Sequence, residues 1–314
     1  MTYRGTGWRD PAIKTWHAQY GYDAPAAGMA LPMVEYDYGE PVAVVNYVRR
    51  DMALPSGHHV MAAFNAFGHL HSVAGTELPF ITAQYDPSNW AMRLFGHNAS
   101  AQSLLDTEDW TLATERHFAQ QLFRLRGKQL PDMSRWPDVS WSTAPWPRFQ
   151  DQDDEYDHLA DMEEMEWPCS DMSSRRRDYE PKGQAPWRVK VPCVDMDLAV
   201  VDKHRNRLAL LVDYKAPGAR INLKSTNVQA LSSLYTDYRG QWVNVPAMVV
   251  KYDRLDDRVT FMVHCLNATA SSMLAFVLGH YGADSEVLAQ AVAGDGWTTL
   301  DRRLWLALLA EAKG

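Results

Sequence analysis

The chain has 314 residues, 46% of them hydrophobic and 22% charged, which excludes disorder of the whole chain and allows two modest domains. It has no run of 18 apolar residues and no basic and apolar leader, so we expect no membrane span, no secretory signal and a cytoplasmic location. The formal net charge of −8 and the three scattered cysteines exclude a strongly basic chain, a disulfide framework and a zinc knuckle, so any metal is expected to have oxygen ligands.

Several short patterns occur twice, in the same order along the chain. Residues 42–48 (VAVVNYV) match 209–215 (ALLVDYK), and 79–86 (PFITAQYD) match 246–253 (PAMVVKYD), both at an offset of 167 positions. The triplets 98–100 and 267–269 match at an offset of 169, and residues 111–127 match 298–314 at 187. These matches predict a tandem duplication, with a first copy over 1–127 and a second over 166–314.

The first copy is predicted to end in a helix. One stripe of a helix would carry five residues of mixed size and end at Gly127, a typical stop residue; they are Trp110, Thr114, Phe118, Leu122 and Leu125. Strands alternating with helices make each copy a mixed α/β domain, with a mixed central sheet flanked by helices.

Residues 128–165 are predicted to be a linker, rich first in Pro and Trp and then in acidic residues. We expect its tryptophans to pack on one or both domains. The acidic run at 151–171 has ten Asp and Glu and no Lys or Arg, which leaves 29 acidic residues against 31 Lys and Arg elsewhere. Nucleic acid therefore stays open as a partner. The run is either a solvated linker or an imitation of DNA that covers a basic surface.

The second copy is predicted to begin with a β-hairpin whose strands cover 194–201 and 208–214, joined by the polar turn 202–207. A helix over 227–235 follows, with Val228, Leu231, Leu234 and Tyr235 on one face. Two strands over 245–252 and 258–265, a turn at 253–257 and a C-terminal helix complete the copy.

The hairpin brings together residues that carry chemistry. Asp213 and Lys215 are two positions apart on a strand and therefore project from one face, as do Asp195 and Asp197. The turn would place Asp197 beside Asp213. Two carboxylates suit Mg²⁺, which proteins usually hold through one or two carboxylates together with water and substrate phosphate. The alternative is an ordinary ion pair at the end of a strand.

Residues 194–200 (VDMDLAV), 210–215 (LLVDYK) and Gln229 resemble the PD-(D/E)XK nuclease superfamily, which has a restriction-endonuclease-like fold. The resemblance implies a Mg²⁺-dependent nuclease, with Mn²⁺ as an alternative ion and DNA as the expected substrate. It implies that Asp197 and Asp213 hold the metal, that Lys215 assists the attacking water and that Gln229 supports the site. Pro192 precedes Cys193 and not a metal-binding Asp, so Asp195 is an alternative to Asp197.

The first copy lacks this constellation. It has Asn46-Tyr47-Val48 at the triplet, and Pro32 or Met33 where the first Asp would lie. We therefore expect a degenerate copy that serves stability or substrate binding, so that the chain resembles a dimer with one active site. A non-catalytic module that binds nucleic acid or protein on a nuclease-like fold is the competing interpretation.

Other polar and aromatic groups have a structural and a functional interpretation. The basic residues before the hairpin would either contact phosphates or offset the acidic linker; they are Arg175, Arg176, Arg177, Lys182 and Arg188. Trp16, Tyr20, Tyr22 and Trp90 are expected in the core and not as platforms for bases. His58, His59, His69 and His71 lack a third metal ligand at a convincing spacing, so structural or surface roles are expected.

Overall fold

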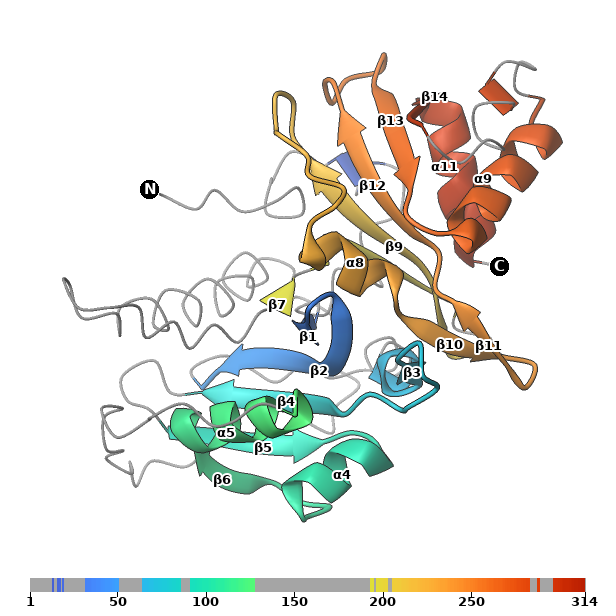
Figure 1. The fold of residues 1–314 in the computed structure, drawn as a ribbon. Helices are drawn as coiled ribbons and strands as arrows, with labels where there is room; N and C mark the ends of the chain where they lie inside the picture. The colour runs from blue at the N-terminus through green and yellow to red at the C-terminus, as the bar shows by residue number, and fades with distance from the viewer. Residues whose placement is uncertain are drawn as a thin grey trace.

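The computed structural model describes residues 32–50, 64–85, 91–127, 196–202, 205–282 and 296–313, together with residues 13, 16, 17, 19, 193, 194, 287 and 288. This part of the chain is a mixed α/β structure, in which mixed sheets are flanked by helices (Figure 1).

The first sheet has the strand order β6-β5-β4-β2-β1-β7 among the described residues. Its strands are β1 (Met33–Asp37), β2 (Glu40–Arg49), β4 (Phe80–Tyr85), β5 (Ala91–Gly96), β6 (Thr111–Thr114) and β7 (Cys193–Val194). Only the pair β2 and β4 is parallel among the strand pairs described in this sheet. Helices α4 (Ala99–Leu105) and α5 (Glu115–Leu125) lie on one face (Figure 1).

The second sheet has the order β14-β13-β12-β9-β8. Its strands are β8 (Leu198–Asp202), β9 (Arg207–Lys215), β12 (Ala247–Tyr252), β13 (Thr260–Cys265) and β14 (Thr298–Asp301). Strands β9 and β12 are parallel and the other described neighbours are antiparallel. Helices α9 (Ala268–His280) and α11 (Arg302–Lys313) lie on one face of this sheet (Figure 1).

The two sheets also agree in register. The pairs Met33 with Val45 and Leu198 with Val212 occupy the same place in the two hairpins. Further out, Ile81 pairs with Gly96 as Met248 pairs with Cys265, and Leu94 pairs with Thr111 as Val263 pairs with Thr298. Each hairpin has a bulge at the same step, after Glu35 in one and after Val200 in the other.

The helices begin where the sequence offers a cap. Asn98 and Asn267 stand in extended backbone before α4 and α9, and each side chain accepts the N–H of the residue three positions on. Thr114 does the same for α5 through the N–H of His117, 3.0 Å away. These short polar side chains satisfy amide groups that the first turn of a helix leaves without a partner.

Two strand pairings join the halves of the chain. Strand β7 pairs with β1 at the edge of the first sheet, four residues before β8 begins in the second. Strand β3 (Leu70–His71) pairs with β10 (Tyr235–Tyr238), which pairs with β11 (Gln241–Asn244) in a small third sheet. In Figure 1, β3 accordingly lies beside the β10–β11 hairpin.

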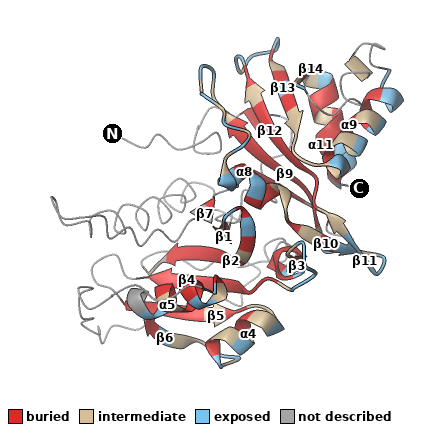
Figure 2. Cartoon of the chain, in the orientation of Figure 1, coloured by how far each residue is buried: buried red, intermediate tan, exposed pale blue. Residues whose placement is uncertain are grey.

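The buried residues form three clusters. One lies between the second sheet and helices α9 and α11, and it also contains Ile13 and Trp16 from the start of the chain. Another lies between the first sheet and helices α4 and α5. The third contains residues from both sheets and from helix α8 (Thr226–Ser232), so the inner faces of the sheets share a core (Figure 2). Trp16 is 3% exposed, which confirms its predicted place in the core.

Three predicted elements differ from the structure. The single strand over 194–201 is wrong, because residues 193–194 belong to the first sheet and β8 begins at Leu198 in the second. The helix over 227–235 is too long, because Tyr235 begins β10. The stripe from Trp110 is also wrong: residues 111–114 form β6, and Thr114 caps the shorter helix α5. In the two predicted helices, hydrogen bonding to a neighbouring strand outweighs the helical spacing of apolar residues.

Candidate functional site

Strand β9 positions the Asp213–Lys215 pair. Side chains alternate along a strand, and Val212 and Tyr214 lie in the core under helices α9 and α11. Asp213 and Lys215 therefore project from the opposite, inner face of the sheet. Lys215 Nζ donates a hydrogen bond to Asp213 Oδ1, and the two side chains are 17% and 12% exposed, respectively. The two-residue spacing thus gives the contact that it predicts.

Asp197 lies at the start of β8, next to this pair. It directly precedes Leu198, which pairs with Val212, so the register places Asp197 beside Asp213. Asp197 is 2% exposed, and its Oδ2 accepts the N–H of Tyr214 at 2.7 Å. Because β8 begins only at Leu198, the Asp197 carboxylate takes the place of a strand carbonyl for this amide.

Tyr214 lies between the site and the core. Burial raises its pKa well above the ordinary value, and the negative charge of Asp197 raises it further, against a side-chain hydrogen bond with Trp305 that lowers it. Its hydroxyl lies 2.8 Å from His17 Nε2. Tyr214 is thus held neutral in the core while its backbone amide positions Asp197.

The oxygen atoms of Asp197 and Asp213 are the ligands that this site can offer to a cation. The described residues contain no group of three or more His, Cys, Asp or Glu side chains that could hold a metal. Two carboxylates fit Mg²⁺, which usually retains several waters and completes its shell with substrate phosphate. A zinc site, by contrast, would need three or four protein ligands.

Gln229 of α8 lies against the first half of the chain. A Cβ atom added to Gly39, in the turn between β1 and β2, would lie 2.8 Å from Gln229 Oε1 and 2.9 Å from Gln229 Cβ. Among the hydrogen bonds of the described residues, none joins the Gln229 side chain to Asp213 or Lys215. The structure therefore gives Gln229 a packing contact between the halves.

Several predicted residues lie outside the described part of the chain: Asp195, Arg175, Arg176, Arg177, Lys182, Arg188, Tyr20, Tyr22, Trp90, His58, His59 and the linker at 128–165. Of the four histidines considered as metal ligands, His69 and His71 lie in the described part. His71 Nδ1 lies 2.9 Å from the backbone oxygen of His69, and the His71 ring lies 3.6 Å from that of Trp242. His71 thus packs against Trp242 of β11.

The first half carries uncharged residues where the second has its site. Pro32 precedes the Met33–Val45 pair as Asp197 precedes the Leu198–Val212 pair. Asn46 stands at the place of Asp213 and donates a hydrogen bond of 3.4 Å to Thr82 Oγ1. Thr82 Oγ1 in turn lies 2.7 Å from His97 Nε2, and burial lowers the pKa of His97 to about 4. The first half thus has a series of uncharged side chains joined by polar contacts where the second half has its charged pair.

Sequence reasoning missed a buried charged network in the first half. Glu35 of β1 accepts hydrogen bonds from the Tyr47 hydroxyl at 2.6 Å and from Arg126 at 3.2 Å. The signal available in the sequence was a charged residue between the apolar Val34 and Tyr36 in the strand MVEYD. Its partner is 91 positions away, so the sequence alone does not indicate the pairing.

No family model matches the chain, and neither a curated protein nor a solved structure matches it. Within the described residues, every helix is too short or too polar to cross a membrane. The function must therefore be inferred from the geometry of this chain.

Proposed function

We propose that the chain is a Mg²⁺-dependent nuclease of the PD-(D/E)XK type, acting on DNA through Asp197, Asp213 and Lys215. The observation that carries the proposal is the meeting of these residues at one end of the β8–β9 hairpin, where the lysine contacts one carboxylate and the other is fixed by a backbone amide. Charged side chains at the end of a buried strand lower the stability of the fold unless they pair with each other or bind a ligand such as a metal ion.

The residues have separate roles in this proposal. Asp197 and Asp213 would hold the ion, with Mn²⁺ as an alternative to Mg²⁺. When bound, the ion polarises the phosphoryl oxygen and lowers the pKa of a water molecule. Lys215 is placed to orient the attacking water and to offset the negative charge that develops on the phosphate. The Tyr214 N–H keeps the Asp197 carboxylate in a fixed orientation.

We also infer that the halves are copies of one restriction-endonuclease-like unit, the first of which has lost its site. The common strand order, the common registers and the bulge at the same step support this. The domain boundaries at 127 and 166 remain predictions. The halves would form a dimer-like unit within one chain, with one metal site.

Cleavage assays on the purified full-length chain test the proposal. The substrates are supercoiled plasmid and single-stranded circular DNA, each incubated with Mg²⁺, with Mn²⁺ or with EDTA. Cleavage should require the metal and be lost in Asp213→Asn and in Lys215→Met. Asn46→Ala, a change at the place of Asp213 in the first half, should leave cleavage unchanged. Cleavage that survives EDTA or Lys215→Met would remove the mechanism.

A non-catalytic module that binds nucleic acid or protein is the second candidate. The observation in its favour is the first half, which has the same strand order and pairing without the charged triad. Fold does not fix function. Binding of DNA that weakens with salt but needs no metal, together with the absence of cleavage of every DNA and RNA form, would favour this candidate.

A further inference from the structure

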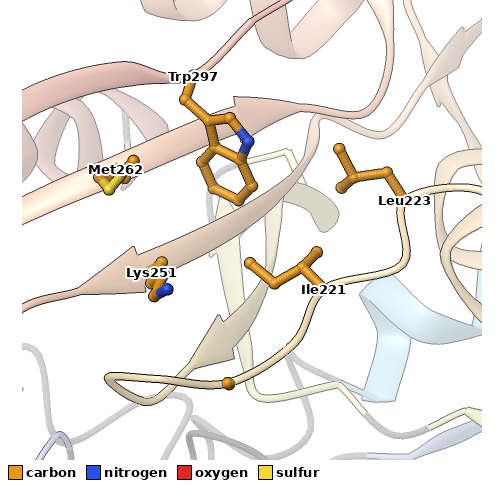
Figure 3. Close-up of a pocket in the computed structure, with 6 residues that line it drawn as sticks. Ile221, Leu223, Lys251, Met262 and Trp297 are labelled. Atoms are coloured by element: carbon orange, nitrogen blue, oxygen red, sulfur yellow. The ribbon is translucent and has the colours of Figure 1, made fainter.

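An open pocket of about 280 Å³ lies on the second sheet, lined by Lys251, Met262 and Trp297 from the sheet side and by residues of the loop after β9, namely Ala219, Ile221 and Leu223. Figure 3 shows the Trp297 ring reaching toward the space between the strands and this loop. Met262 is 40% exposed, so an apolar surface is open to solvent here.

The pocket lies on the face that carries Asp213 and Lys215. Across the sheet, Lys215 pairs with Lys251, Lys251 with Met262 and Met262 with Thr299. Paired residues project from the same face, and neighbouring strands lie about 4.8 Å apart. Lys251 is therefore the immediate neighbour of Lys215, and the apolar part of the pocket begins one strand further away from the proposed metal site.

The first half has a tryptophan at the same place, and there an arginine packs on its ring. Trp110 precedes β6 as Trp297 precedes β14, and Gln84 and Arg93 stand at the places of Lys251 and Met262. The Arg93 guanidinium carbon lies 3.9 Å from the centroid of the Trp110 ring, and Arg93 donates a hydrogen bond of 2.8 Å to Gln84 Oε1. Arg93 is 8% exposed, so a planar cation of the chain itself covers the ring.

The second half replaces this pair. Met262 stands at the place of Arg93 and Lys251 at that of Gln84, and the half-buried Trp297 ring lines the open pocket, with the His264 ring 5.4 Å from it. Methionine in place of arginine removes the covering group, and lysine in place of glutamine adds a positive charge at the rim. A guest that suits this arrangement has a flat aromatic part for the indole ring and an anionic part for the two lysines. An unpaired nucleotide has both parts.

We propose that this pocket binds the base of an unpaired nucleotide next to the bond that is cut, with its phosphate on Lys251. This inference rests on the proposed nuclease function and narrows its substrate to DNA with a single-stranded end or stretch. In a duplex, by contrast, the bases stack on each other and cannot enter without being extruded, which costs a few kcal/mol.

Equilibrium binding to the full-length chain in EDTA tests the pocket without cleavage. The probes are a fluorescein-labelled single strand of mixed sequence and the blunt duplex of the same length, at one salt concentration. The test variant is Lys251→Gln with Met262→Arg, which rebuilds the Gln84–Arg93 cover of the first half without changing the net charge. We expect it to weaken single-strand binding about 5- to 100-fold, as the loss of one base stack does, and to change duplex binding by less than about twofold.

Two further variants keep the test decisive. Trp297→Ala should weaken single-strand binding to a similar extent, while thermal unfolding verifies that it is folded. The matched change in the first half, Gln84→Lys with Arg93→Met, is also neutral in charge and should not weaken binding. Unchanged single-strand binding in both second-half variants, or an equal loss for single strand and duplex, would overturn the proposal.

The experiments distinguish an error in the proposed pocket from an error in the proposed nuclease activity. Metal-dependent cleavage that is insensitive to Trp297→Ala and to the rebuilt cover would leave the nuclease standing without the pocket. Single-strand binding that depends on Trp297, in a chain that cuts nothing, would leave the pocket standing without the nuclease. Asp213→Asn separates the two further, because it should abolish cleavage and retain binding in EDTA.

Discussion

Glu35 and Arg126 form an ion pair 3.2 Å long, with side chains that are 0% and 1% exposed. Arg126 also donates hydrogen bonds to the backbone oxygens of Tyr36 and Leu122, and Glu35 accepts one from Tyr47. Both charges are thus compensated inside the protein, and the pair ties the end of α5 to β1.

Removing one member of this pair should be costly. Arg126→Met leaves a buried carboxylate without its cation, so we expect it to lower the free energy of unfolding by about 3–5 kcal/mol, measured in urea. The double variant with Glu35→Met should recover most of this loss. Arg302→Met breaks the exposed pair with Asp257 and serves as the control, with an expected loss of at most about 1 kcal/mol. Equal effects of Arg126→Met and Arg302→Met would contradict the assignment.

Two substitutions at Asp197 should separate its structural role from its role toward the metal. Asp197→Ala leaves the Tyr214 N–H without an acceptor, at a cost of about 1–3 kcal/mol in the free energy of unfolding. Asp197→Asn retains an oxygen acceptor and should unfold close to the wild type, yet bind Mg²⁺ more weakly by calorimetry. If Asn at this position binds Mg²⁺ as tightly as Asp, residue 197 is not a ligand.

The turn between β1 and β2 depends on a glycine. Gly39 has a φ of +92°, and an added Cβ would meet the Gln229 side chain. Gly39→Ala should therefore cost about 1–2 kcal/mol for the left-handed backbone and about 1–3 kcal/mol more for the collision. Gly75 has a φ of +77° with nothing within 4 Å, so Gly75→Ala should show the backbone cost alone. Urea unfolding of both variants gives the difference, and equal losses would show that Gln229 moves aside freely.

His97 should make stability depend on pH. Its ring packs against those of Phe64 and Phe80, with centroids 4.7 Å from each, and burial lowers its pKa from 6.5 to about 4. Above pH 6.5 the ring is neutral in both the folded and the unfolded chain, so it does not make the free energy of unfolding depend on pH. Between pH 6.5 and 4 the ring is protonated in the unfolded chain but stays neutral in the folded one, so the free energy of unfolding falls as the pH falls. The loss attributable to this group is at most about 3 kcal/mol, since the ring is partly exposed.

The measurement is the difference between the wild type and His97→Gln in urea, from pH 7.5 to pH 4. The wild type should lose more stability over this range than the variant. Parallel curves for the two proteins would mean that the ring titrates normally in the folded state.

The site was predictable where it depends on local spacing, and the rest was not. Asp213 and Lys215 are two positions apart, which alone places them on one face. The hydrogen bond from the Tyr214 amide to Asp197 depends on where β8 begins, and the apolar-rich segment 194–201 does not indicate that the chain changes sheets inside it. Apolar character reports burial but not the partner strand.

The β10–β11 hairpin was missed although its turn carries a local signal. Arg239 and Gly240 both have positive φ, at 55° and 80°, as a two-residue hairpin turn requires, and a glycine at this place favours that turn. The predicted helix over 227–235 ended in this hairpin because Tyr235 continued its spacing of apolar residues. The second partner of β10 is β3, more than 160 positions earlier, a distance at which no local pattern indicates a contact.

The exchange of strands between the halves makes them mechanically dependent on each other. Strand β7, at the edge of the first sheet, is followed in the sequence by β8 of the second sheet. Strands β3 and β10 form a second connection between the halves in the small third sheet. Moving the halves apart would break the backbone hydrogen bonds of the β1–β7 and β3–β10 pairs. A protease cut between the halves should accordingly leave the two fragments bound together, and grafting one half onto another protein would leave a sheet edge bare.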